Sequence, residues 1–294
     1  MQFGVALPHF SRLASREAVV TLAREAESLG YDSIWTTDHV LMAADQPDPY
    51  GTILEAVVTL SYVAAVTERV RLGTSVIVLP QREPVLVAKQ AATLDILSNG
   101  RLILGVGAGW NEREFGFLGA NFHDRGRRFD EYIQAMRTLW SEPDARFDGK
   151  SVQFADVSFQ PRTVQPGGPP IWLGGGSRAA LRRAATLCDG WHATGATVEE
   201  FASGMQTIRE LAGERKVVGS VRLRTAVGRT LPEQRNARGG VQARLSGSRE
   251  EVVEGIQAYA RAGASDLLLY FGADDLDTNL ADMRLFADQV RTRV

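Results

Sequence analysis

The sequence is poor in cysteine, in long apolar runs and in charge of one sign. Its 294 residues include one cysteine, Cys188, which excludes an internal disulfide and is typical of a cytoplasmic protein. No run approaches the roughly 18 apolar residues of a membrane-spanning helix. The first residues lack the basic segment and apolar stretch of a signal peptide. We therefore expect a cytoplasmic chain with no membrane partner.

Charge and histidine content exclude further classes. The 33 basic and 35 acidic residues nearly cancel, to a net charge of -2, so nothing indicates a nucleic-acid partner. The four histidines are scattered without metal-ligand spacing, and we predict no metal. The chain also contains no G-x-S-x-G elbow and no P-loop.

A regular alternation of apolar stretches and amphipathic segments is present instead, which indicates parallel strands joined by helices. The predicted strands cover residues 2–7, 33–39, 70–79, 101–107, 170–174, 189–194, 217–227 and 266–271. Eight units predict an α/β protein with a (β/α)8 TIM barrel, a single domain over residues 1–294, rather than a doubly wound open sheet. The predicted insertions follow strand four (111–125), precede strand five (143–169) and follow strand seven (229–245).

Side chains that follow barrel strands are candidates for chemistry, because barrel active sites lie at the C-terminal strand ends. Asp38 and His39 follow the second strand, where an imidazole beside a carboxylate suits acid–base catalysis or binding of a polar substrate group. The alternative, in which Asp38 caps the next segment and His39 is merely packed, has equal weight. His9 and His192, after strands one and six, are candidates for lining the mouth.

Three glycines, Gly105, Gly107 and Gly109, alternate with small residues at the end of the fourth strand. The missing side chains would let a planar cofactor approach the backbone, and a tight turn explains the same glycines equally well. The third glycine comes one residue too early for the dinucleotide fingerprint. Beyond it, Glu112 or Glu114 is a candidate proton donor, although a solvated charged turn is favoured.

A second glycine-rich stretch follows the fifth strand and consists of Gly174, Gly175, Gly176 and Ser177. Free backbone N–H groups and the positive end of a helix dipole would point to one spot there, which suits a phosphate group. The alternative is a flexible turn with Ser177 as the N-cap. Cys188, on the apolar side of the next helix, is predicted to be core.

Together these stretches resemble the bacterial luciferase-like family of flavin and deazaflavin enzymes. The matching segments, in the family's order and spacing, are residues 30–39, 72–76, 100–115, 170–177 and 189–191. The resemblance implies a (β/α)8 barrel with the cofactor ring at its C-terminal mouth. The compact chain and its Gly-Val-Gly-Ala-Gly-Trp-Asn-Glu stretch are most similar to the subgroup that uses coenzyme F420, with FMN as the alternative cofactor.

The resemblance also implies roles by position. Residues Thr74, Ser75 and Val76, ordinary strand material by composition, would back the ring, with a cis peptide bond between Ser75 and Val76. Asp38 and His39 would lie close to its reactive edge. The remaining cofactor contacts would come from two glycine-rich stretches: Gly107, Ala108 and Gly109 beside the ring, and Gly174 to Ser177 at the phosphate.

One residue departs from the resemblance. Sugar-phosphate dehydrogenases of this family place a glutamate where this chain has Trp110, so sugar-phosphate oxidation is not predicted, and Trp110 would narrow the substrate pocket instead. The implied function is an F420-dependent oxidoreductase that moves a hydride between the deazaflavin and a small-molecule substrate, as a homodimer. The alternatives are an FMN-dependent two-component monooxygenase and a non-catalytic flavin- or F420-binding protein.

Overall fold

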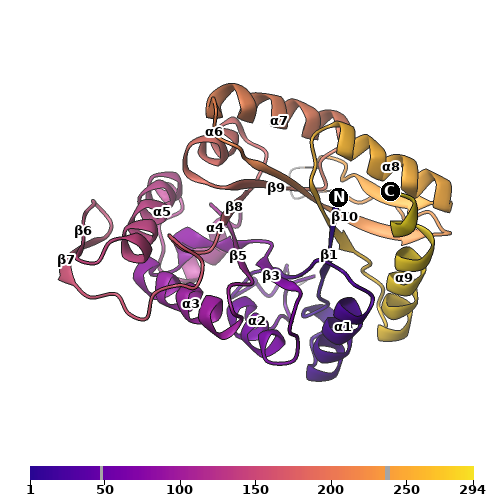
Figure 1. Ribbon diagram of the computed structural model, residues 1–294, viewed down its shortest axis with the longest axis horizontal. Helices are drawn as coiled ribbons and strands as arrows, with labels where there is room; N and C mark the ends of the chain where they lie inside the picture. The colour runs from indigo at the N-terminus through magenta and orange to yellow at the C-terminus, as the bar shows by residue number, and fades with distance from the viewer. Residues whose placement is uncertain (47–48, 236–238) are drawn as a thin grey trace.

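Eight parallel strands form a closed barrel in the computed structural model, which describes residues 1–46, 49–235 and 239–294. Each strand pairs in parallel with the next around the ring, and the last pairs with the first (Figure 1). In ring order they are β1 (Gln2–Ala6), β2 (Ser33–Thr36), β3 (Arg71–Thr74), β5 (Leu102–Gly107), β8 (Ile171–Gly174), β9 (Gly190–Thr194), β10 (Val218–Val227) and β12 (Asp266–Tyr270). The predicted TIM barrel is confirmed, and the open sheet is excluded because β12 closes on β1.

Helices surround the strands and bury their apolar faces against the sheet. They are α1 (Arg16–Ser28), α2 (Ala56–Ala64), α3 (Pro84–Leu97), α5 (Arg125–Ser141), α6 (Arg178–Leu187), α7 (Val198–Ala212), α8 (Arg249–Arg261) and α9 (Leu276–Gln289). A capping box starts α8, where Ser248 and Glu251 satisfy each other's backbone N–H groups. The Glu55 side chain caps the start of α2 by accepting a hydrogen bond from Val58 N–H.

The insertions carry structure of their own. The first holds α4 (Glu112–Phe117), and the second holds an antiparallel hairpin of β6 (Ala145–Asp148) and β7 (Gln153–Val157). The hairpin projects at the left of Figure 1, away from the ring of strands. The third insertion includes residues 236–238, which lie outside the described residues, and ends in β11 (Arg244–Gly247), paired with β10. Short 3-10 turns complete the chain: η1 (Ser11–Leu13), η2 (Leu79–Gln81) and η3 (Arg291–Arg293).

The third predicted strand, residues 70–79, is interrupted. Strand β3 ends at Thr74, and β4 (Ile77–Val78) resumes alongside β5. The Ser75–Val76 peptide bond between them is cis, as the resemblance implied. This interruption, termed the bulge below (Thr74 to Val76), lies at the C-terminal end of the barrel, where the active site is expected.

Side chains fill the barrel interior below the bulge. Trp35 and Trp172 lie with ring centroids 5.3 Å apart, and the His192 ring stacks on Trp35 at 5.1 Å and an interplanar angle of 2°. All three side chains are buried. A packed interior leaves the strand ends as the place for ligands. In the described part of the chain, no helix is both long and apolar enough to cross a membrane.

Candidate active site

The bulge is held from both neighbouring strands. Ser75 N–H donates to the Thr36 carbonyl oxygen of β2 at 2.6 Å. The Thr74 hydroxyl donates to the Gly105 carbonyl oxygen of β5 at 2.7 Å, and the Thr37 hydroxyl donates to the Ser75 carbonyl oxygen at 2.9 Å. Thr74 and Ser75 are buried, whereas the side chain of Val76 is half-buried. The bulge therefore presents Val76 as an apolar platform at the mouth.

Glycines of the neighbouring strands make room for this bulge. A Cβ atom on Gly105 would lie 1.7 Å from the Thr74 carbonyl oxygen, and one on Gly107 would lie 2.8 Å from a Val76 methyl group. Gly174 of β8 faces the same Val76 side chain, at 3.0 Å. The close approach that the sequence indicated is therefore made by the protein's own backbone at Gly105. Gly109 fits the tight-turn alternative, with φ of +81°.

The stretch after β8 combines a helix start with an exposed backbone. Ser177 accepts a hydrogen bond from Ala180 N–H at 3.2 Å and so caps α6, as predicted. Trp191 fixes the turn by donating its indole N–H to the Gly175 carbonyl oxygen at 2.8 Å. Gly175, Gly176 and Ser177 are exposed, and no atom lies within 4 Å of where a Gly176 Cβ would be. An anion can therefore approach this turn, which begins beside the Val76 platform.

Across the mouth, His39 pairs with Glu114 of α4. The distance from His39 Nδ1 to Glu114 Oε2 is 2.9 Å, and the other carboxylate oxygen accepts from Val40 N–H at 2.7 Å. Burial raises the pKa of Glu114, but the hydrogen bonds from His39 and Val40 outweigh it and hold the pKa below its ordinary value. The favoured expectation of a solvated charged turn is wrong for Glu114, which is 1% exposed. It fits Glu112, whose side chain is exposed.

Aromatic rings hold His39 on two sides. Its ring stacks on Tyr50 with centroids 4.5 Å apart, and Trp110 meets it edge-on at 5.8 Å. Trp110 is 49% exposed and lies beside His39 at the C-terminal strand ends.

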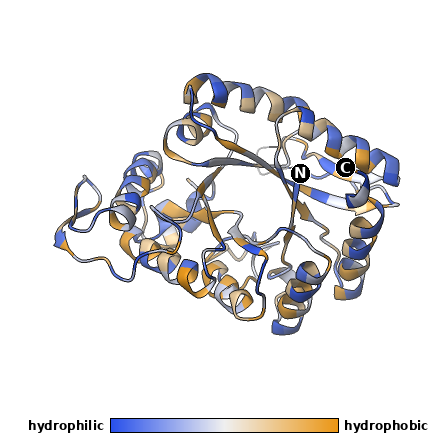
Figure 2. Ribbon diagram, in the orientation of Figure 1, coloured by the Kyte–Doolittle hydropathy of each residue, from blue (hydrophilic) through white to orange (hydrophobic). Residues whose placement is uncertain are grey.

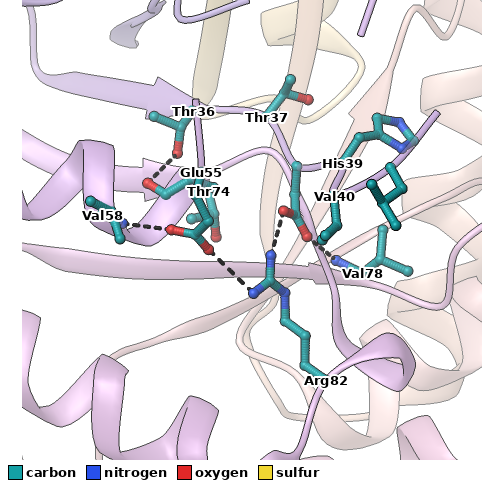
Figure 3. Close-up of polar contacts among 12 residues, drawn as sticks. Thr36, Thr37, His39, Val40, Glu55, Val58, Thr74, Val78 and Arg82 are labelled. Atoms are coloured by element: carbon teal, nitrogen blue, oxygen red, sulfur yellow. Dashed lines mark hydrogen bonds and ion pairs between the residues drawn. The ribbon is translucent and has the colours of Figure 1, made fainter. Parts of the chain in front are cut away.

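Asp38 faces away from His39 and does not pair with it. Its carboxylate accepts from Val78 N–H of β4 at 2.9 Å and from the Arg82 guanidinium at 2.7 Å. Arg82 also lies 3.2 Å from a Glu55 carboxylate oxygen, and in Figure 3 the His39 ring points away from Arg82. The predicted Asp38–His39 pair is therefore corrected: Glu114 orients the imidazole, and Asp38 anchors β4.

His9 and His192 lie inside the barrel, so the idea that they line an open mouth is also corrected. His9 Nε2 accepts from Thr37 N–H at 3.2 Å, and His192 bridges the Ser75 and Ser220 hydroxyl groups at 2.8 Å each. Burial lowers the pKa of both rings, that of His192 to about 3, so His192 is neutral near pH 7. His9 therefore holds the end of β2 at Thr37, and His192 holds the bulge at Ser75, both from inside the barrel.

Two predictions concern groups away from the mouth. Cys188 is buried in the core, as predicted, and burial raises the pKa of its thiol to about 12. Among the residues that the structure describes, no three His, Cys, Asp or Glu side chains gather in an arrangement that could hold a metal ion.

Arg222 and Tyr270 belong to the mouth and were missed from the sequence. Arg222 of β10 donates to the Thr37 hydroxyl at 3.3 Å and to the Ser75 carbonyl oxygen at 3.4 Å. Its guanidinium carbon lies 5.1 Å from the centroid of the Tyr270 ring. The sequence did contain a signal for Arg222. Ser220 and Arg222 are polar residues at alternate positions of an otherwise apolar strand, which indicates that both side chains lie on the same face of that strand.

The architecture defines the class of protein: a (β/α)8 barrel with a platform, an anion-accessible turn and a His–Glu pair at the C-terminal strand ends. Comparison with known families identifies the family within this class. Residues 1–232 match the model of the luciferase-like monooxygenase family, and the chain belongs to that family.

Two relatives illustrate the similarity in sequence. An uncharacterised protein of Mycobacterium tuberculosis is 34% identical over 206 residues, which cover 65% of this chain and 73% of that protein. An F420-dependent glucose-6-phosphate dehydrogenase of Amycolatopsis mediterranei is 33% identical over 180 residues. The latter match covers 60% of this chain and 53% of the dehydrogenase, so it spans about half of that enzyme.

Solved structures show the same fold over the whole chain. An F420-dependent secondary alcohol dehydrogenase in complex with an F420–acetone adduct has a TM-score of 0.82 at 18% identity, covering 100% of this chain and 99% of that one. A monooxygenase from Streptomyces bottropensis has a TM-score of 0.82 at 23% identity, covering 99% and 98%. At these identities the likeness concerns the fold.

Proposed function

We propose that this chain is an F420-dependent oxidoreductase that transfers a hydride between the deazaflavin and a carbon of a small organic substrate. The observation that carries the proposal is the Val76 platform, which adjoins an exposed glycine turn at the start of α6. A flat ring with a phosphate-bearing tail needs both an apolar platform and an adjoining turn that an anion can reach. Similarity to F420-dependent enzymes in sequence and in fold supports this cofactor.

The protein's part is to bind and orient, while a bound deazaflavin would supply the hydride chemistry. In this proposal the bulge backs the ring on its Val76 side. Gly107, Ala108 and Gly109 flank the ring, and the turn Gly174 to Ser177 binds the phosphate through backbone N–H groups.

His39 is the proposed group that gives or takes the substrate's proton. Because an ionised carboxylate can only accept hydrogen bonds, the pairing with Glu114 assigns a proton to His39 Nδ1. The imidazole is then fixed in orientation, and Nε2 is left for proton exchange with substrate or water. Asp38 contributes indirectly, by holding β4 beside the platform.

Trp110 sets the substrate range in this proposal. The resemblance places the glutamate of sugar-phosphate dehydrogenases at its position, and an indole ring cannot replace a carboxylate as a proton donor. We therefore do not propose sugar-phosphate oxidation. The bulky, half-exposed ring favours small or flat substrates.

An FMN-dependent monooxygenase is the second candidate, favoured by the fold shared with the Streptomyces bottropensis monooxygenase. Titration of the purified protein with oxidised F420 and with FMN separates the two, followed by quenching of cofactor fluorescence. Tight F420 binding without FMN binding supports the first proposal, and the reverse result refutes it. Binding without turnover of reduced cofactor across a broad substrate panel favours a non-catalytic binding protein.

The phosphate assignment has its own test at Gly176, where a side chain meets no protein atom. Gly176→Asp places a carboxylate at the proposed anion site and should weaken cofactor affinity at least about tenfold, through repulsion of the phosphate. Gly176→Asn, of nearly equal size and no charge, is the matched control. Equal cofactor affinities of the two variants would refute the assignment of the phosphate site to this turn.

A further inference from the structure

Arg222 is a buried cation without a buried anion beside it. Its side chain reaches the mouth from β10 and remains 9% exposed. Among the described residues, no carboxylate forms an ion pair with it, whereas Arg82 is paired with both Asp38 and Glu55. A buried charge ordinarily has a charged partner, because desolvation is costly.

The groups that accept hydrogen bonds from Arg222 are neutral. Its two hydrogen bonds go to the Thr37 hydroxyl and the Ser75 carbonyl oxygen, both longer than 3.2 Å. The Arg222 charge helps to lower the pKa values of His9 and His192, and it opposes the burial that raises the pKa of Tyr270. Both hydrogen bonds are donated by one guanidinium nitrogen, so the guanidinium keeps N–H donors for another group.

A row of aromatic rings, the aromatic arc, connects Arg222 with the His39–Glu114 pair. The arc consists of Trp110, His39, Tyr50, Phe10 and Tyr270, in that spatial order. Successive centroids lie 5.8, 4.5, 5.3 and 5.8 Å apart. Such a row offers flat apolar contacts between a proton-exchanging group at one end and a cation at the other.

We propose that Arg222 binds a carboxylate of the substrate, and that the substrate is a planar, apolar molecule carrying that carboxylate. The proposal rests on the proposed function for the reaction itself. Guanidinium and carboxylate match in geometry and form two parallel hydrogen bonds. The carboxylate would neutralise the buried charge, while the aromatic arc contacts the body of the molecule and places its reacting carbon near His39.

The same guanidinium could instead bind a carbonyl oxygen of the cofactor ring, and the experiment separates these two sources. Benzoate is the probe, and benzamide is its uncharged counterpart of the same shape. Binding is measured by thermal shift and tryptophan fluorescence, without F420 and with saturating F420. Substrate binding predicts that benzoate binds the F420 complex at least as well as the free protein. Competition between benzoate and F420 would overturn the proposal.

Arg222→Met tests the residue. Benzoate affinity should fall at least about tenfold while benzamide affinity stays low and unchanged. The melting temperature should not fall, because the variant removes an unpaired buried charge. A lower melting temperature with unchanged benzoate affinity would show a purely structural role and overturn the proposal.

Arg146→Gln, an exposed charge on the hairpin, is the matched control and should bind benzoate as wild type does. If F420 fails to bind wild type, the proposed function fails, yet benzoate binding to the free protein still decides the role of Arg222. If benzoate binding depends equally on Arg146 and Arg222, general charge attraction explains it and the proposal is overturned.

Discussion

Glu114 shows how one buried carboxylate organises the mouth. It accepts hydrogen bonds from His39 of the β2 end and from the backbone of Val40. The sequence placed His39 correctly after a strand, but it could not identify the orienting carboxylate. Asp38 is adjacent in sequence and points the other way, whereas Glu114 lies 75 residues on and reaches His39 only because α4 folds back over the mouth.

Glu114→Gln should destabilise the protein by about 1–3 kcal/mol at pH 7, because a charge-assisted buried hydrogen bond is lost. The folded-state pKa of Glu114 lies below its ordinary value of 4.5, so this contribution is complete above that pH and is lost as pH falls through the folded pKa. Urea denaturation at pH 7 and at successively lower pH measures it.

Glu112→Gln is the control two residues away, and its exposed side chain should make no measurable difference at any pH. A Glu114→Gln variant whose stability loss is the same at pH 3 as at pH 7 would show that ionisation of Glu114 is not the source.

At the scale of elements, the contact between β3 and β5 depends on glycine. Gly105→Ala would put a methyl group against the Thr74 carbonyl oxygen, a backbone atom that cannot move without displacing the bulge. We expect a loss of more than about 2 kcal/mol. Cofactor affinity should fall as well, because Val76 moves with the bulge. Denaturation and F420 titration measure the two effects.

Gly116→Ala is the opposite case on α4, where a Cβ meets nothing within 4 Å. It should stabilise the protein by up to about 1 kcal/mol through helix propensity, and leave F420 affinity unchanged. Equal stability of the Gly105→Ala and Gly116→Ala variants would contradict the proposed contact at Gly105.

Element boundaries show what periodicity predicts and what it misses. The cap at Ser177 could be predicted from the sequence because an N-cap depends on residues only three apart. The break after Thr74 could not be predicted from periodicity, because Thr74 to Val76 have the composition of an ordinary strand. Only the family resemblance indicated the bulge, and a contact with β5 sustains it.

At the scale of the molecule, alternation of strands and helices was sufficient to predict the barrel, since eight parallel units have few ways to close. The mouth was predicted only in part. His39, Trp110 and the turn at Gly176 lie there, while Arg222 and Tyr270 come from the last quarter of the chain. Their side chains meet Thr37 and Phe10 only after the ring of strands closes.

We propose that the chain is a homodimer that associates through α2 and α3. Helix α2 contains no charged residue, and Val58 of α2 and Leu86 of α3 are exposed. Figure 2 shows orange, hydrophobic positions along both helices. An exposed apolar surface of this kind marks an association site.

Val58→Glu combined with Leu86→Glu should convert the dimer to a monomer, because burying two carboxylates at an interface is costly. Size-exclusion chromatography with light scattering measures the mass. Leu211→Glu, on the exposed face of α7, should leave the dimer intact. A monomeric wild-type protein would refute the proposal.

The glycines around Val76 have a consequence for how such chains diverge. Gly105, Gly107 and Gly174 lie on two strands and far apart in sequence, yet all three make room for one bulge. A lineage that loses the bulge no longer needs this room, whereas a lineage that keeps it is constrained at all three positions, most strictly at Gly105, where a Cβ would meet backbone. The three positions should therefore be inherited together or abandoned together, which makes them a signature for recognising, from sequence, descendants that have given up the platform.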